Sequence, residues 1–173
     1  RLVAQKGIEL LLPLLERLAG DGFGFALLGT GDPVLEVQTA AVAAALPGRV
    51  AFVRGFDDGL ARRIYAGCDL FLMPSRFEPC GLAQMQAMRY GTLPVVTDVG
   101  GLHDTVVDVD ADPTRGTGVT AAQATSIDVL DAWHRAARAW GNRPRRDAMR
   151  RRGMTADWSW SEPARHHLEW YER

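Results

Sequence analysis

The chain has 173 residues, of which 47% are hydrophobic and 24% are charged. This is the composition of a globular protein, so it excludes a disordered tail and a collagen-like chain, and the length predicts one domain. With 20 basic and 21 acidic side chains the formal net charge is −1, which argues against nucleic acid as the main partner.

Hydrophobic periodicity and turn residues predict short apolar strands that alternate with helices. Pro13 falls inside the first helical pattern and is expected to kink that helix or to shift its start. Asp32 is expected to cap the second helix, and Gly91 to end the fourth. The predicted elements are, in chain order, a helix around 8–15, a strand at 23–28, a helix at about 33–46, a strand at 50–53, a helix at 58–66, a strand at 70–73, a helix at 82–90, a strand at 93–97, a short strand at 106–107, and helices at 126–140, 145–152 and 162–171.

This alternation predicts an α/β fold, a Rossmann-like doubly wound parallel sheet with right-handed crossovers. In such sheets, ligands bind beyond the carboxyl ends of the strands. Polar and glycine-rich residues gather at those ends, and Gly100 and Gly101 are expected to make a tight turn there. The strand-end segments are 29–33, 55–58, 74–81 and 98–104.

The segment from Ser75 to Leu82 carries the most specific functional signal. Two prolines stiffen this loop, and Gly81 allows a ligand to approach the backbone. The helix that follows presents free N–H groups and the positive end of its dipole to an anion such as phosphate. Glu78 is either a helix cap or a ligand contact, and its place in a proline-braced loop favours the contact.

Three weaker candidates lie at other strand ends. Gly29 and Gly31 form an incomplete dinucleotide fingerprint, so a tight turn before a capped helix is the favoured interpretation. Phe56 either stacks on a nucleobase or covers the edge of the sheet. Arg1 and Lys6 either neutralise a diphosphate or are solvated surface charges, and Lys6, as the only lysine of the chain, favours a function.

The remaining polar residues give no pattern typical of metal or nucleic-acid binding. Cys68 and Cys80 form no CxxC pair, which argues against a zinc knuckle and favours a reducing compartment. His166 and His167 are adjacent, so they diverge on a helix. The arginine run at 143–152 has no interleaved aromatics and is interpreted as a solvated helix face. No apolar run reaches the roughly 18–20 residues that cross a bilayer.

Five motifs, taken together, resemble the C-terminal half of bacterial glycogen synthases, close to plant starch synthases. The similarity runs over essentially the whole chain and ends near 157–160. It implies the C-terminal half of a GT-B glycosyltransferase, in which two Rossmann-like domains face a cleft. Residues 1–173 are then the nucleotide-sugar-binding domain, a piece of a longer protein, and a helix at about 161–173 packs on the absent N-terminal domain. The motifs are RLVAQKG at 1–7, GTGDP at 29–33, PSRFEPCGL at 74–82, YGTLPV at 90–95 and GGLHDTV at 100–106.

This resemblance implies retaining transfer of glucose from ADP-glucose to the non-reducing end of an α-1,4-glucan, in the cytoplasm, without metal or cofactor. Glu78 matches the carboxylate that faces the glucose, and Arg1 and Lys6 match the cations that stabilise the leaving ADP. Phe56 matches an aromatic that stacks on adenine. The other matching residues are Gly29 and Gly31 beside the nucleotide, and Cys80, Gly81 and Leu82 beside the sugar. The acceptor groove belongs to the absent domain, so the isolated chain is expected to bind the nucleotide but to be inactive.

Two alternatives remain open. The first is another retaining GT-B enzyme that uses a UDP- or GDP-sugar, and Gln86 disfavours it because broader relatives place a second glutamate at this position. The second is a flavodoxin-like binding or signalling domain. It would call for an acidic cluster and a lysine late in the chain, and no lysine follows Lys6. The choice of ADP over UDP rests on the resemblance alone.

Overall fold

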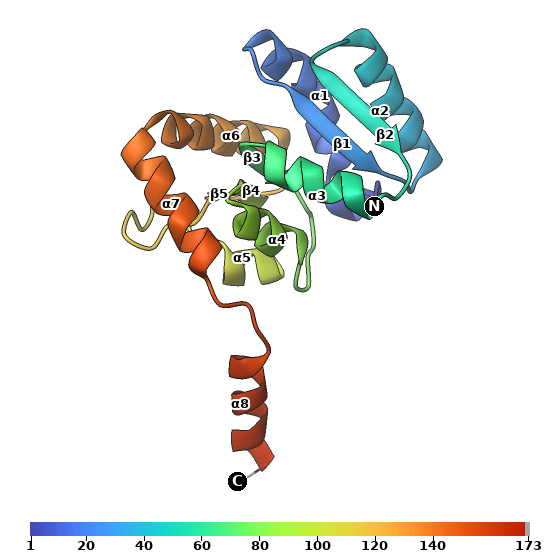
Figure 1. Ribbon diagram of the computed structural model, residues 1–173. Helices are drawn as coiled ribbons and strands as arrows, with labels where there is room; N and C mark the ends of the chain where they lie inside the picture. Colours follow the sequence, from blue (N-terminus) through green and yellow to red (C-terminus); the bar gives the residue numbers. More distant parts are fainter. Residues whose placement is uncertain (172–173) are drawn as a thin grey trace.

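The structure, a computed structural model, describes residues 1–171 and has parallel strands with helices between them (Figure 1). The strands are β1 (Phe25–Gly29), β2 (Val50–Arg54), β3 (Leu70–Met73), β4 (Leu93–Thr97) and β5 (Val119–Ala121). The helices are η1 (Ala4–Lys6, a 3₁₀ turn), α1 (Ile8–Gly20), α2 (Pro33–Ala45), α3 (Asp58–Gly67), α4 (Ala83–Tyr90), α5 (Gly100–Thr105), α6 (Ser126–Gly141), α7 (Arg143–Thr155) and α8 (Ser161–Tyr171). The predicted α/β class is confirmed.

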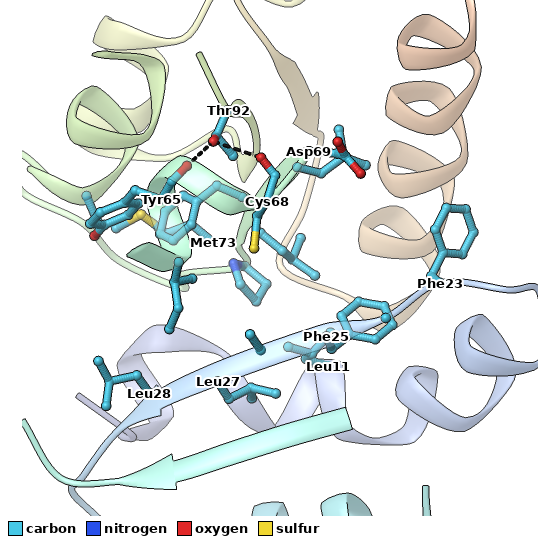
Figure 2. Close-up of a pocket in the computed structure, with 18 of the residues that line it drawn as sticks. Leu11, Phe23, Phe25, Leu27, Leu28, Tyr65, Cys68, Asp69, Met73 and Thr92 are labelled. Atoms are coloured by element: carbon cyan, nitrogen blue, oxygen red, sulfur yellow. Dashed lines mark hydrogen bonds between the residues drawn. The ribbon is translucent and has the colours of Figure 1, made fainter. Parts of the chain in front are cut away.

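The strands form two sheets and not the one continuous sheet that was predicted. β1 pairs with β2, while β4 lies between β3 and β5, and all of these pairings are parallel. Among the described residues, no backbone hydrogen bond joins β1 to β3. A cavity lies between these two strands (Figure 2).

Both faces of the larger sheet are buried, as expected for a doubly wound fold. Successive residues of a strand point to opposite faces. Val95 of β4 packs in the main core with Trp133 of α6, whereas its neighbour Val96 packs with Leu102 of α5. A third apolar cluster joins α1 to β2 through residues that include Leu15. Helices therefore cover the sheet on either side and leave the strand ends as the open, polar region.

The predicted caps are confirmed. The Asp32 carboxylate accepts hydrogen bonds from the N–H groups of Val34 and Leu35, at 2.8 and 3.2 Å, at the start of α2. Gly91 ends α4 with a φ of 81°, in the left-handed region that favours glycine. Helix α1 starts at Ile8 and continues through Pro13, so the proline does not mark the helix start.

Two predictions around the fourth strand are wrong. Gly100–Thr105 is a helix and not a tight turn, and the predicted strand at 106–107 is not formed. The glycines obscured the helix because glycine is a poor helix former. Their presence has a steric reason: a Cβ at Gly101 would lie 2.1 Å from the Cys80 carbonyl oxygen. The strand that follows α5 in the chain is β5, whose three residues are too few to show the alternation that predicts a strand.

The solvated interpretation of the arginine run is wrong for three of its members. Arg145 donates to the Val109 carbonyl at 3.0 Å, Arg150 to Gly91 at 3.0 Å and Arg152 to Gly116 at 2.8 Å. These arginines therefore bind α7 to neighbouring loops, which explains why the helix carries them.

Helix α8 stands apart from both sheets at the end of an extended connection (Figure 1). Its region exposes large apolar side chains, with Trp160, Leu168 and Trp170 at 82%, 62% and 79% exposure. Such a face is typical of a helix that another domain covers. Packing on an N-terminal domain remains a prediction, and residues 172–173 of the predicted 161–173 helix lie outside the described residues. Within 1–171, no helix is long and apolar enough to span a membrane.

Candidate active site

The first residues of the chain bring two strand ends together. Leu2 pairs in parallel with Gly31, donating from its N–H to the Thr30 carbonyl at 3.0 Å. Three residues later, the Gln5 carbonyl accepts from the N–H of Arg76 at 2.8 Å, beyond the end of β3. The segment is thus fastened to the loop after β1 and to the loop after β3.

An ion pair lies at the centre of this junction. The Lys6 ammonium contacts the Glu78 carboxylate, and their side chains are 23% and 8% exposed. The Ser75 hydroxyl donates to the same Glu78 oxygen at 3.3 Å. The Glu78 backbone is fixed as well, since its carbonyl accepts from the N–H of Gly101 at 2.8 Å. A nearly buried carboxylate of this kind is stable because it has charged and hydroxyl partners.

Arg1 lies at the same junction, because it directly precedes Leu2 and borders the cavity between β1 and β3 together with Lys6. Gly7 permits the tight approach of this segment to β3: its φ is 66°, and a Cβ there would lie 1.9 Å from the Pro74 carbonyl oxygen. Of the three residues predicted to be catalytic, the structure thus places Lys6 against Glu78 and sets Arg1 at the same junction.

The loop after β3 ends at a helix N-terminus that no side chain caps. Gly81 has a φ of 72°, and Leu82, the N-cap of α4, is 65% exposed and makes no capping hydrogen bond through its side chain. Cys80 is also exposed. The buried Gln84 amide donates to the Gly81 carbonyl at 2.8 Å and holds this turn in place. No pattern in the sequence indicated this role of Gln84.

Phe56 lies beside the Gly29 turn, because Gly55 donates to the Gly29 carbonyl at 3.1 Å. Its side chain is 88% exposed, so it does not cover the edge of the sheet. It presents a free aromatic face next to the loop that carries Gly29 and Gly31. The predicted residues thus form two adjacent groups. The aromatic and glycine group, Phe56 with Gly29 and Gly31, follows β1 and β2. The charged group, Arg1 and Lys6 with Glu78, comes from the first residues of the chain and from the loop after β3.

Glu36 holds the glycine turn and was missed by the sequence analysis. It is 5% exposed, and its carboxylate accepts from the Thr30 hydroxyl at 2.6 Å and from the Gly31 N–H at 2.7 Å. The Thr30 hydroxyl, the Gly31 amide and the nearby Arg54 guanidinium lower the pKa of Glu36. A carboxylate in the first turn of a helix is common, so its position alone did not signal this role.

Replacing Glu36 by Gln is expected to destabilise the fold more at pH 7 than at pH 3. The folded-state pKa of Glu36 is lowered, so its contribution is present above the unfolded value of about 4.3 and is lost as the pH falls through the folded value. Urea unfolding of Glu36→Gln at both pH values measures the difference, and Glu16→Gln, on an exposed part of α1, is the control. Equal destabilisation at the two pH values would mean that the Glu36 charge does not hold the turn.

Comparisons with known proteins agree on a family. The family model described as Glycosyl transferases group 1 matches residues 1–153. A glycogen synthase from Halorhodospira halophila is 49% identical over all of this chain and 36% of its own length, and one from Anaeromyxobacter dehalogenans is 50% identical over 95% of the chain and 34% of its own. The chain thus spans about a third of the length of these relatives.

Solved structures agree on the fold as well. The catalytic domain of starch synthase IV from Arabidopsis thaliana, bound to ADP and acarbose, superposes with a TM-score of 0.90 at 35% identity, covering 100% of this chain and 36% of that one. A sucrose-phosphate synthase from Thermosynechococcus elongatus matches with a TM-score of 0.72 at 26% identity, over 99% of this chain and 43% of that one.

Proposed function

The chain belongs to the group 1 glycosyl transferases, and from this premise we propose that it is the donor-binding half of an ADP-glucose-dependent glycogen synthase. The proposed reaction is retaining transfer of glucose from ADP-glucose to the non-reducing end of an α-1,4-glucan. The glycogen synthases at 49% and 50% identity, and the related starch synthase solved with ADP, support this donor. The family match overturns the flavodoxin-like alternative.

The observation that carries the proposal is the ion pair of Lys6 and Glu78, which lies in the segment that begins with Arg1 and in the loop that leads to the uncapped start of α4. A diphosphate placed there would meet two cations and the N–H groups of a helix N-terminus, which are the groups that bind phosphates. Lys6 and Glu78 neutralise each other in the structure. We propose that the diphosphate competes for Lys6 and thereby leaves the Glu78 carboxylate facing the sugar.

This exchange suits the charges that develop in the reaction. When the bond between the anomeric carbon and the diphosphate oxygen breaks, negative charge grows on the oxygen and positive charge grows on the carbon. Arg1 and Lys6 would stabilise the first charge, and Glu78 the second. The glucan 4-hydroxyl oxygen then bonds to the anomeric carbon in place of ADP, and the hydroxyl proton passes to the departing diphosphate.

The aromatic and glycine group is assigned to the nucleoside. Adenine would stack on the exposed face of Phe56, and the glycine turn at Gly29 and Gly31 would allow the ribose and phosphates close to the backbone. Cys80, Gly81 and Leu82 would contact the sugar. The two cysteines of the chain are free thiols, which supports a reducing, cytoplasmic location.

Lys6→Ala is expected to weaken ADP binding by about 10- to 150-fold and AMP binding much less. A charge-assisted hydrogen bond to phosphate contributes about 1.5–3 kcal/mol, and AMP has one phosphate fewer to receive it. Calorimetry with both nucleotides measures the two changes, and Arg17→Ala on α1 is the control. An equal loss for ADP and AMP would mean that Lys6 does not bind the second phosphate.

Phe56→Ala is expected to weaken ADP by about 5- to 150-fold, because stacking of a base on an aromatic ring is worth about 1–3 kcal/mol. Phe77, which is 59% exposed in the loop after β3, provides the matched control in Phe77→Ala. Calorimetry on both variants tests the nucleoside assignment. An affinity for ADP unchanged by Phe56→Ala would remove this residue from the site.

A further inference from the structure

The contact between Lys6 and Glu78 joins two segments that lie far apart in the chain. The two residues are separated by 72 positions, one at the end of η1 and the other in the loop after β3. A lysine side chain has many rotamers, so its ammonium does not by itself fix where the two segments meet. The place of the ion pair is therefore set by other contacts between the segments, and the structure contains such contacts on either side of Lys6.

Gln5, the residue before Lys6, bonds to the loop after β3 twice. Its backbone carbonyl accepts from the N–H of Arg76 at 2.8 Å, and its side-chain amide donates to the Phe77 carbonyl at 3.0 Å. Phe77 in turn directly precedes Glu78. The two bonds thus hold the backbones together immediately before both members of the ion pair.

Glu9 binds the same loop from the other side of Lys6. It lies in the first turn of α1, and its carboxylate accepts from Nε of Arg76 at 2.8 Å. Its second oxygen is buried and has no hydrogen-bond partner among the described residues, so Arg76 is the group that offsets the burial of this charge. The Glu9 and Arg76 side chains are 33% and 47% exposed, and such an ion pair adds little to the stability of a fold. Its loss should therefore leave the chain folded.

The contact with Glu9 distinguishes two roles for Arg76, a cation two residues before Glu78. If Arg76 bound the diphosphate itself, removing the Glu9 charge would free it and strengthen nucleotide binding. If Arg76 holds the loop to α1, removing Glu9 would weaken binding. The buried oxygen of Glu9 favours the second role, because departure of Arg76 would leave a partly buried carboxylate without its cation.

We propose that Gln5, Glu9 and Arg76 are positioning residues that set where the Lys6 ammonium meets Glu78 and the donor diphosphate. Gln5 aligns the two backbones before the ion pair, and Glu9 and Arg76 hold the loop against the start of α1 after it. None of the three touches the donor, and each acts through Lys6. The inference rests on the proposed function, because the diphosphate is the ligand that Lys6 is positioned to meet.

The test is calorimetry of ADP and AMP with Gln5→Leu, Glu9→Met and Arg76→Met, each alone and each combined with Lys6→Ala. Each single substitution is expected to weaken ADP binding by about 3- to 10-fold, because residues of one contact network couple by this order. AMP binding should change much less, since it has no second phosphate for Lys6 to meet. In the Lys6→Ala background none of the three should weaken ADP further, because the residue through which they act is gone.

Matched controls come from the exposed side of α1. Glu16→Met and Arg17→Met make the same exchanges of a charged side chain for methionine away from the loop, and they should bind both nucleotides as the unaltered chain does. Urea unfolding of every variant separates a local change from a loss of the fold, and the midpoints of Glu9→Met and Arg76→Met are expected to stay near that of the unaltered chain.

Three results would overturn the proposal. Stronger ADP binding by Glu9→Met, with weaker binding by Arg76→Met, would make Arg76 a ligand of the diphosphate. Unchanged ADP affinity in all three variants would mean that Lys6 is placed without them. Equal losses for ADP and AMP, or the same loss in the Lys6→Ala background, would mean a merely structural role.

The unaltered chain separates this inference from the proposed function. If it binds ADP and any of the three results follows, the positioning role fails while the assignment of the donor site stands. If it binds neither nucleotide, the assignment of the donor site fails, and the positioning role fails with it.

Discussion

Glu78→Gln in the full-length enzyme is expected to lower kcat by about 10²- to 10³-fold, the range found when one group that stabilises a transition-state charge is removed. Gln keeps the shape and hydrogen-bonding reach of the side chain and removes only its charge. That charge matters most while the anomeric carbon becomes positive, so its loss affects the chemical step more than the binding of ADP-glucose.

The ion pair between Lys6 and Glu78 leads to a second expected result for Glu78→Gln, which concerns its affinity for ADP. Lys6 contacts Glu78, so a diphosphate that binds Lys6 must compete with a carboxylate partner. In Glu78→Gln that competition is removed, and ADP should bind as tightly as before or more tightly. Steady-state kinetics and ADP calorimetry measure the two effects, with Glu16→Gln as control. A near-normal kcat with a raised KM would make Glu78 a binding residue only.

These 173 residues alone are expected to add no measurable glucose to glycogen. The strand ends supply cations, a helix N-terminus and one carboxylate, which suffice to hold a sugar diphosphate. None of the described side chains is placed to align a glucan hydroxyl with the anomeric carbon, and such alignment contributes about 7–11 kcal/mol toward lowering a barrier. In the proposed enzyme that alignment comes from the other domain, which the exposed face of α8 would contact.

The assay uses ADP-glucose and glycogen with the chain alone and then with the remaining part of the protein added in trans. Activity is expected only in the second mixture, and the single chain should still bind ADP there. Robust glucan extension by the chain alone would contradict both the half-enzyme interpretation and the assignment of the acceptor groove to another domain.

Local patterns predicted most of the fold, because strands such as β4 are short apolar runs and turn residues such as Gly91 end the helices. They could not reveal that the strands pair in two separate sheets, because this depends on which strands lie side by side in space. They also missed β5, because three residues are too few to show the alternation of a strand. They missed α5 because it begins with two glycines, which allow its close approach to the loop after β3.

The candidate site, like the fold, was predicted from the sequence only in part. Glu78 and Lys6 were predicted from loop chemistry and from a motif, and the structure places them in contact. Glu36 and Gln84 were missed because such residues are common in the first turn of a helix, and only their burial against the preceding turn gives them their roles. Whether a carboxylate on a helix is solvated or holds a loop is decided by packing, and one sequence does not contain that information.

Calorimetry of ADP and of UDP with this chain tests the central claim, that the strand ends around Lys6 and Glu78 are the site of an adenine nucleotide sugar. We expect ADP to bind at least several-fold more tightly than UDP, because the larger base gains more from stacking on Phe56. Binding of UDP as tight as that of ADP, or no binding of ADP to this chain or to the full-length protein, would contradict the claim.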